Sequence, residues 1–182
     1  MKVKQEQVTI EAHDGACRAW LLGPEGDGQW PAVSVYMDAL AIRPAMIELA
    51  ATIAAAGYVV LLPDMFYRFG PYDTLDANTV LAQDFRTVLG PMMASVDNSK
   101  SALDTACFLE YLASLPQVRP GPVGTTGYCM RRHVVDRRRH LPRSRGRGRQ
   151  LPWRKPGNRF VQEPPPAGVA DESRDLRRRC GP

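Results

Sequence analysis

Residues Gly127-Tyr128-Cys129-Met130 have the types and order needed to present a reactive sulfur. Gly-x-Cys-x gives the first four positions of a nucleophile elbow, where a strand turns sharply into a helix and exposes the central side chain. Cys129 is the predicted nucleophile, the Met130 N–H would face an oxyanion, and Gly127 fits a turn too tight for larger residues. Taken alone, a cysteine such as Cys129 is more often a small buried hydrophobe.

The segments before this turn are those expected to position it. Apolar residues alternate or run continuously in several strand-like stretches, and helical spacing of apolar residues follows Pro44 and ends at Gly57. The predicted strands are Val3–Ile10, Cys17–Leu22, Ala32–Tyr36 and Tyr58–Leu62, with a turn at His13-Asp14-Gly15. Strand, helix and strand in about thirty residues form a βαβ unit, so the sequence predicts the α/β class.

The segment from residue 63 to the elbow supplies a loop and two further predicted helices. Pro63–Asp76 is irregular and aromatic, and we expect it at the carboxyl edge of the sheet, where α/β folds bind ligands. Asp76–Leu89 is predicted as one helix and Asp97–Leu115 as a stronger one. In the second helix, the apolar stripe consists of Ala102, Ala106, Leu109 and Ala113, beside Leu103 and Leu112.

With these elements in order, the sequence resembles the dienelactone hydrolase family of α/β-hydrolases, which uses Cys at the elbow. Two further segments match that family: Tyr36–Arg43, where the family has an acid after its third strand, and Leu62–Arg68, which is similar to its Pro-Asp-Leu-Tyr-x-Arg segment. The resemblance covers roughly residues 5–130. It implies an α/β-hydrolase-like three-layer sandwich that is incomplete after the elbow.

The resemblance also implies roles for individual residues. Cys129 would attack an ester or lactone carbonyl as a thiolate, and the N–H groups of Met130 and Ala39 would form the oxyanion hole. Asp38 stands where the family has the acid that holds the thiol and helps to deprotonate it, and Arg68 would pair with a substrate carboxylate. From the residues alone, Asp38 could instead cap the following helix, and Arg68 could form a surface ion pair.

Composition divides the chain at the elbow. Residues 1–130 hold 8 Lys and Arg against 14 Asp and Glu, whereas residues 131–182 hold 16 against 5, with 15 Arg and 7 Pro. We therefore expect a partial hydrolase domain over residues 1–130. The second part has too few apolar residues for a core, so we expect a largely disordered basic tail. The break inside the motif, at Arg131, favours a change of reading frame or a truncated gene as its origin.

The sequence thus predicts a hydrolase of small esters or lactones, among them carboxylate-bearing ones, that needs no cofactor or metal. Residues 131–182 contain no segment similar to the family's later Asp and Gly-His, so we expect impaired activity. The alternatives are a non-catalytic remnant, or nonspecific nucleic-acid binding through the Arg-rich tail. The start of the chain has no apolar core of a signal peptide and no apolar run spans a bilayer, which predicts a cytoplasmic protein without membrane or specific nucleic-acid partners.

Overall fold

A computed structural model describes residues 1–127, with the exception of the Leu81 side chain. Its centre is a mixed sheet of strand order β1-β2-β4-β3-β5. The strands are β1 (Val3–Ala12), β2 (Gly15–Pro24), β3 (Ala32–Tyr36), β4 (Val59–Pro63) and β5 (Gly124–Gly127). The predictions made for Cys129, Met130 and the tail from residue 131 fall outside the described residues, so they stay predictions.

The sheet combines an antiparallel hairpin with parallel strands. β1 pairs antiparallel with β2, and β2 pairs antiparallel with β4. β4 and β5 both pair parallel with β3. All five residues of β4 are buried, which confirms that the continuous apolar run after Gly57 is an interior strand.

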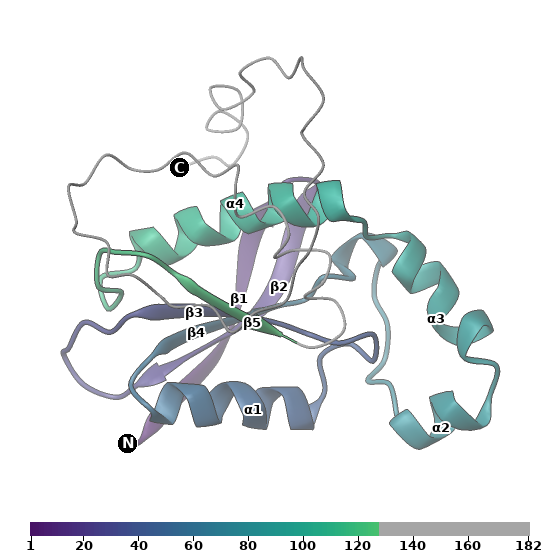
Figure 1. Ribbon diagram of the computed structural model, residues 1–182, viewed down its shortest axis with the longest axis horizontal. Coiled ribbons are helices and arrows are strands. Elements are labelled where there is room, and N and C mark those ends of the chain that lie inside the picture. The colour runs from purple at the N-terminus through teal and green to yellow at the C-terminus, as the bar shows by residue number, and fades with distance from the viewer. Residues whose placement is uncertain (128–182) are drawn as a thin grey trace, which may run out of the picture.

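Helices lie on both faces of this sheet, as Figure 1 shows: α1 (Pro44–Ala55) crosses one face and α4 (Asn98–Ser114) crosses the other. The helix predicted after Arg43 is confirmed, with Pro44 in its first turn and Gly57 at a positive φ of 94° just beyond its end. The predicted three-layer α/β architecture is therefore confirmed for the described part of the chain.

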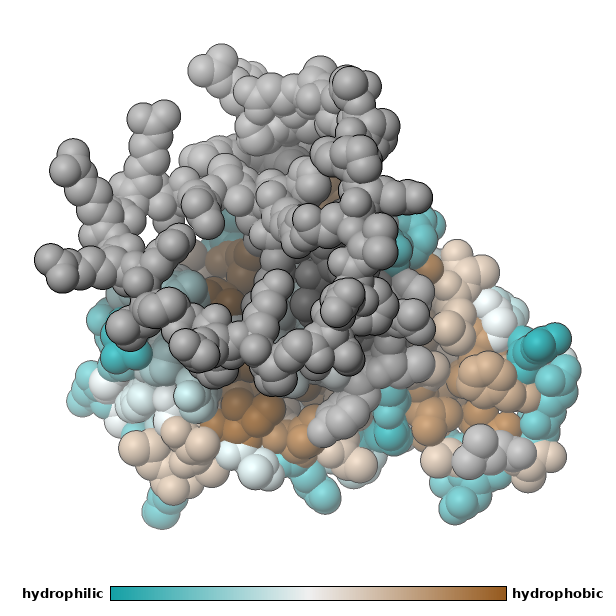
Figure 2. Space-filling model, viewed as in Figure 1, coloured by the Kyte–Doolittle hydropathy of each residue, from teal (hydrophilic) through white to brown (hydrophobic). Residues whose placement is uncertain are grey.

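The single helix predicted over Asp76–Leu89 is wrong. The chain forms two helices, α2 (Ala77–Ala82) and α3 (Phe85–Ala94). Asp84 separates them because its carboxylate accepts hydrogen bonds from the Arg86 N–H at 3.2 Å and the Thr87 hydroxyl at 2.8 Å, which starts a new helix. Apolar residues gather at the surface over α2 and α3 (Figure 2), where Phe85 is 46% exposed.

The prediction of the buried face of α4 is only partly right. Ala113 of the expected apolar stripe is exposed, and its other members are half-buried. The buried face carries polar residues in its first turns and apolar residues later: Ser101, Asp104, Thr105, Phe108 and Leu112. Two of these polar side chains have partners from other elements: the Thr105 hydroxyl lies 2.8 Å from the Tyr36 hydroxyl, and the Asp104 carboxylate accepts hydrogen bonds from Arg68. The Ser101 hydroxyl has no hydrogen-bond partner in the described part of the chain.

Candidate active site

Three segments leave the parallel strands at the same edge of the sheet. β3 ends at Tyr36, β4 ends at Pro63, and β5 ends at Gly127. In the parallel pairing of β3 with β5, Tyr36 lies directly beside Gly127. β3 and β5 therefore end at the same level, and Asp38 and Cys129 each come two residues later in the sequence.

Gly127 is required by the neighbouring strand. A Cβ atom at this position would lie 2.7 Å from the Tyr36 carbonyl oxygen and 2.9 Å from the Tyr36 Cβ. Gly127 is not among the glycines with positive φ. The sequence analysis attributed Gly127 to a tight turn, which lies outside the described residues; within them, the close approach of β3 already excludes a larger residue at this position.

The loop after β3 is organised around the Asp38 carboxylate. The two terminal nitrogens of Arg43 donate to its two oxygens at 2.6 and 2.7 Å, and the Leu40 N–H donates at 2.9 Å. The loop also holds Ala41 at a φ of 62°, a left-handed conformation that costs roughly 1–2 kcal/mol for a residue with a Cβ. The hydrogen bonds of Asp38 offset this strain.

These contacts exclude one of the two interpretations of Asp38 and leave the other open. Asp38 does not cap α1, because Arg43 occupies the N-cap position and the Asp38 carboxylate turns back into its own loop. Burial by itself raises the pKa of Asp38, but the Arg43 guanidinium and the Leu40 N–H together lower it below its ordinary value. Asp38 is therefore a carboxylate at neutral pH. Its predicted contact with Cys129 involves a residue outside the described part.

The same loop contains a backbone donor that is not satisfied. Ala39 is 9% exposed, and its N–H donates no hydrogen bond within residues 1–127. Buried backbone N–H groups are nearly always paired, so one without a partner among the described residues is a donor that a ligand could satisfy. This observation is what an oxyanion-hole donor would require of Ala39.

The loop after β4 is fixed by Asp64, which is 3% exposed. Its carboxylate accepts hydrogen bonds from the Phe66 N–H at 3.0 Å and from the Tyr72 hydroxyl at 2.6 Å. The Phe66 and Tyr72 rings meet edge to face with centroids 6.4 Å apart. Phe66 and Tyr72 of this loop thus pack and form hydrogen bonds within the loop.

Tyr72→Phe is expected to lower the free energy of unfolding by about 1–2 kcal/mol, because Asp64 loses a short hydrogen bond in a buried position. Urea unfolding followed by circular dichroism measures this loss. Tyr58→Phe is the matched control, since Tyr58 is 38% exposed and its hydroxyl has no partner among the described residues. An equal effect of the two substitutions would contradict the proposed role of the Asp64 contact.

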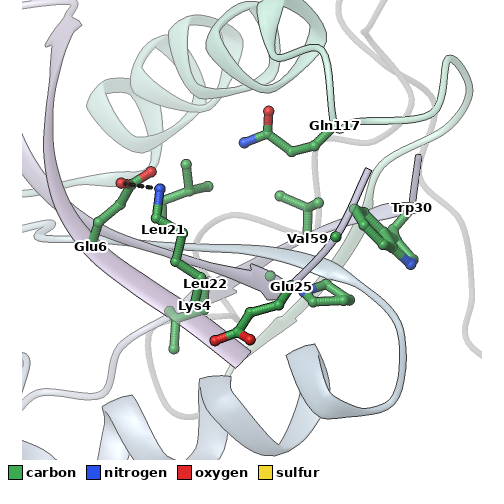
Figure 3. A pocket seen from close by; sticks show the side chains of 11 residues that line it. Lys4, Glu6, Leu21, Leu22, Glu25, Trp30, Val59 and Gln117 are labelled. Carbon is green, nitrogen blue, oxygen red and sulfur yellow. Dashed lines mark ion pairs between the residues drawn. The ribbon is translucent and has the colours of Figure 1, made fainter. Parts of the chain in front are cut away.

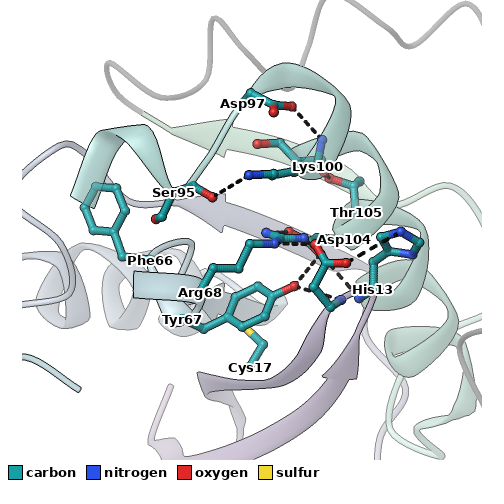
Figure 4. A network of polar contacts seen from close by, with 12 residues as sticks. His13, Cys17, Phe66, Tyr67, Arg68, Ser95, Asp97, Lys100, Asp104 and Thr105 are labelled. Atoms are coloured by element: carbon teal, nitrogen blue, oxygen red, sulfur yellow. Dashed lines mark hydrogen bonds and ion pairs between the residues drawn. The ribbon is translucent and has the colours of Figure 1, made fainter. Parts of the chain in front are cut away.

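Arg68 follows this loop in the 3-10 turn η1 (Tyr67–Phe69), and it is held by two carboxylates (Figure 4). Its terminal nitrogens donate to both oxygens of Asp104 at 2.7 and 2.8 Å, and its Nε donates to Asp14 at 2.6 Å. The Tyr67 hydroxyl also donates to Asp104 at 2.8 Å. Asp104 is fully buried and the Arg68 side chain is 9% exposed. This network joins the β1–β2 turn, η1 and α4.

The interpretation of Arg68 as a surface ion pair is therefore wrong, because the pair is buried. Pairing with a substrate carboxylate stays a prediction, and it would require Arg68 to exchange one of its two present partners. Sequence reasoning missed Asp104, the central residue of the network. The one signal in the sequence was the helical spacing of Asp104 with Phe108 and Leu112, which places this acid on the buried face of α4. A buried carboxylate is costly without a cation, so this spacing indicates a buried partner.

Cys17 lies next to this network, and its surroundings make its thiol unreactive. Its sulfur is fully buried and donates to the Asp64 carbonyl oxygen at 3.4 Å. Burial, reinforced by the Asp64 and Asp104 charges, raises the pKa of the Cys17 thiol far above its ordinary value. Within residues 1–127 no three His, Cys, Asp or Glu side chains are grouped to hold a metal ion, and no helix is long and apolar enough to cross a membrane.

A separate hollow of about 320 Å³ lies at the other end of the sheet (Figure 3). Its floor is formed by Leu21, Leu22 and Val59, and Trp30 forms one wall. Val59 is the first residue of β4, whereas the loops described above leave the last residues of the parallel strands. This hollow is therefore remote from the candidate site.

Comparison with known proteins gives a consistent result. The family model described as "Dienelactone hydrolase family" matches residues 17–134. Carboxymethylenebutenolidase of Pseudomonas sp. (strain P51) is 30% identical over 125 residues, covering 69% of this chain and 51% of that protein. Carboxymethylenebutenolidase 1 of Cupriavidus pinatubonensis (strain JMP 134 / LMG 1197) is 27% identical over 123 residues, covering 68% and 51%. The chain spans about half the length of these curated relatives.

Solved structures share the fold. A crystal structure from Klebsiella pneumoniae subsp. pneumoniae, of a protein named for dienelactone hydrolase, superposes with a TM-score of 0.60 at 19% identity, covering 71% of this chain and 51% of that one. The dienelactone hydrolase-like promiscuous phosphotriesterase P91, from metagenomic libraries, gives a TM-score of 0.53 at 21% identity, covering 71% and 51%. At these identities the likeness establishes the α/β architecture.

Proposed function

The chain belongs to the dienelactone hydrolase family, and from this premise we propose that it acts on ester or lactone bonds with Cys129 as nucleophile. The observation that supports this most is the pairing of Tyr36 with Gly127. Because of this pairing, β3 and β5 end at the same level, and Asp38 and Cys129 each follow two residues later in the sequence. The matched family segment, residues 17–134, includes both.

In this proposal the Cys129 thiolate attacks the carbonyl carbon, and the carbonyl oxygen becomes an oxyanion. The N–H groups of Ala39 and Met130 donate to it; the unpaired state of the Ala39 N–H supports its part. Asp38 is the nearby carboxylate that assists loss of the thiol proton, because a free thiol is mostly protonated at neutral pH. Arg68 recognises a carboxylate on the substrate, provided that the substrate displaces Asp14, its more exposed partner.

We also propose that residues 1–130 form the hydrolase part and that residues 131–182 are a distinct basic segment. The latter contain no match to the family's later Asp and Gly-His, which would supply the base that activates water for deacylation. The acyl-enzyme should therefore form but break down slowly. We place steady-state turnover about 10⁴-fold below that of a complete relative, the usual cost of a disabled triad.

The experiment is acylation of the purified 182-residue protein by p-nitrophenyl acetate. We expect release of about one equivalent of p-nitrophenol, slow turnover afterwards, and an acetyl group on Cys129 by peptide mass spectrometry. Cys129→Ala should abolish both signals, while Cys17→Ala, the matched control with a buried and unreactive thiol, should retain them. Absence of acetyl-Cys129 would overturn the proposed nucleophile, and turnover as fast as that of a complete relative would overturn the impairment.

A further inference from the structure

We propose that Arg43 is a positioning residue for the oxyanion hole: it holds the Asp38 carboxylate, and through it the loop whose Ala39 N–H would meet the oxyanion. This inference rests on the proposed function. Arg43 had no role in the sequence-based predictions, where it served only to mark the start of a helix.

The contacts of Arg43 are directed at the loop, not at the helix that it starts. It occupies the N-cap position of α1 but makes no side-chain cap hydrogen bond. Its guanidinium instead donates to both Asp38 oxygens and, at 3.3 Å, to the Ala41 carbonyl oxygen. Its side chain is 19% exposed and that of Asp38 is 21% exposed, so water competes only partly for this pair.

These bonds fix the peptide groups on both sides of Ala39. The Asp38 carboxylate accepts from the Leu40 N–H at 2.9 Å, and the Asp38 carbonyl oxygen accepts from the Ala41 N–H at 3.2 Å. Ala41 is held at a φ of 62°, which an alanine would leave if the loop were released. The Ala39 N–H shares a planar peptide group with the Asp38 carbonyl, so its orientation is fixed when that carbonyl is held. We infer that it keeps this orientation only while Arg43 holds Asp38.

A fixed donor matters for acylation because an oxyanion hole acts by being oriented before the charge develops. If Arg43 is removed, Asp38 keeps its bond to Leu40 but loses its bidentate partner, and the strained loop can relax. In the proposed function Asp38 also assists loss of the Cys129 proton, so an effect on thiol activation has to be measured separately from an effect on the oxyanion hole. Loosening the loop should slow a reaction that builds an oxyanion more than a reaction that needs only the thiolate.

The test compares Arg43→Gln, Arg43→Lys and the parent chain in two reactions of Cys129. We expect acylation by p-nitrophenyl acetate to slow about 10-fold in Arg43→Gln, a fraction of the roughly 10²–10³-fold effect of losing a whole oxyanion donor. Alkylation by iodoacetamide needs the thiolate but forms no oxyanion, so it should slow much less than acylation, and its rate measures any effect of Arg43 on the thiol through Asp38. Arg43→Lys should fall between, because an ammonium cannot form the bidentate pair. Arg86→Gln is the control, an exposed arginine without an ion pair in the described part.

Hydrogen exchange of the Leu40 and Ala41 amides gives a second readout that does not depend on catalysis. Both amides should exchange faster in Arg43→Gln while β3 and β4 keep their protection. Equal slowing of acylation and alkylation, or no slowing, or unchanged amide exchange would overturn the role of Arg43. If the parent chain is not acylated at Cys129, the proposed function fails, and amide exchange alone still decides whether Arg43 holds the loop.

Discussion

Asp104→Asn is expected to lower the free energy of unfolding by about 3–5 kcal/mol, the usual cost of removing one partner from a buried ion pair. Asparagine nearly matches the shape of aspartate, so the loss reports charge, not volume. The Arg68 guanidinium would keep only Asp14, which lies at the surface, and the Tyr67 hydroxyl would lose a charged acceptor. Three elements would be loosened together, because the network joins the β1–β2 turn, η1 and α4.

Urea unfolding followed by circular dichroism measures this effect. Asp73→Asn serves as the control, since Asp73 is exposed, and its effect should stay within about 0.5 kcal/mol. In the double variant Asp104→Asn/Arg68→Gln the losses should be less than additive, because the second substitution removes the charge that the first leaves unpaired. A loss below about 1 kcal/mol for Asp104→Asn would show that water and Asp14 compensate Arg68, contrary to the buried network.

Gly127→Ala is expected to lower the free energy of unfolding by about 3 kcal/mol, at the upper end for overpacking, because the added methyl meets backbone atoms. It would lie 2.7 Å from the Tyr36 carbonyl oxygen, and neither paired strand can shift without breaking the β3–β5 register. β5 ends at Gly127, two residues before Cys129, so a shift of this strand end would also displace the segment that follows it. We therefore also expect acylation of Cys129 to fall.

Gly124→Ala on the same strand is the matched control. Its Cβ would meet the Val33 Cγ2 at 3.3 Å, the end of a side chain that can move, so its effect should stay below about 1 kcal/mol. Thermal and urea unfolding of the two variants, compared in one buffer, measure the difference. Similar stabilities would mean that β5 is not held against β3 as closely as the structure has it.

Much of the fold was determined by sequence signals that act over a few residues. The apolar run Tyr58–Leu62 favours a buried strand. Pro44 starts α1 because its φ is already helical, and Gly57 ends it because glycine accepts a positive φ. The prediction of a single helix over residues 76–89 was wrong because one local signal was given too little weight. Asp84 has the chemistry of an N-cap, but inside an apolar period this signal was outweighed by the helical spacing around it.

From the sequence, the candidate site could be predicted only as a set of segments that meet at one edge of the sheet. Gly127 and Asp38 could be named because a resemblance linked their segments to a known elbow and acid position. The partners of Asp38 and Arg68 could not be named, since Arg43 and Asp104 are ordinary surface residue types until the chain folds.

Tertiary structure alone decided that Asp38 binds Arg43, that Arg68 binds the buried Asp104, and that the Tyr36 backbone leaves room only for glycine at position 127. The physical reason is that charge pairing and steric exclusion act through space. They join residues up to 91 positions apart, as in the contact of the His13 N–H with Asp104. Local propensity and periodicity contain no information on such pairs.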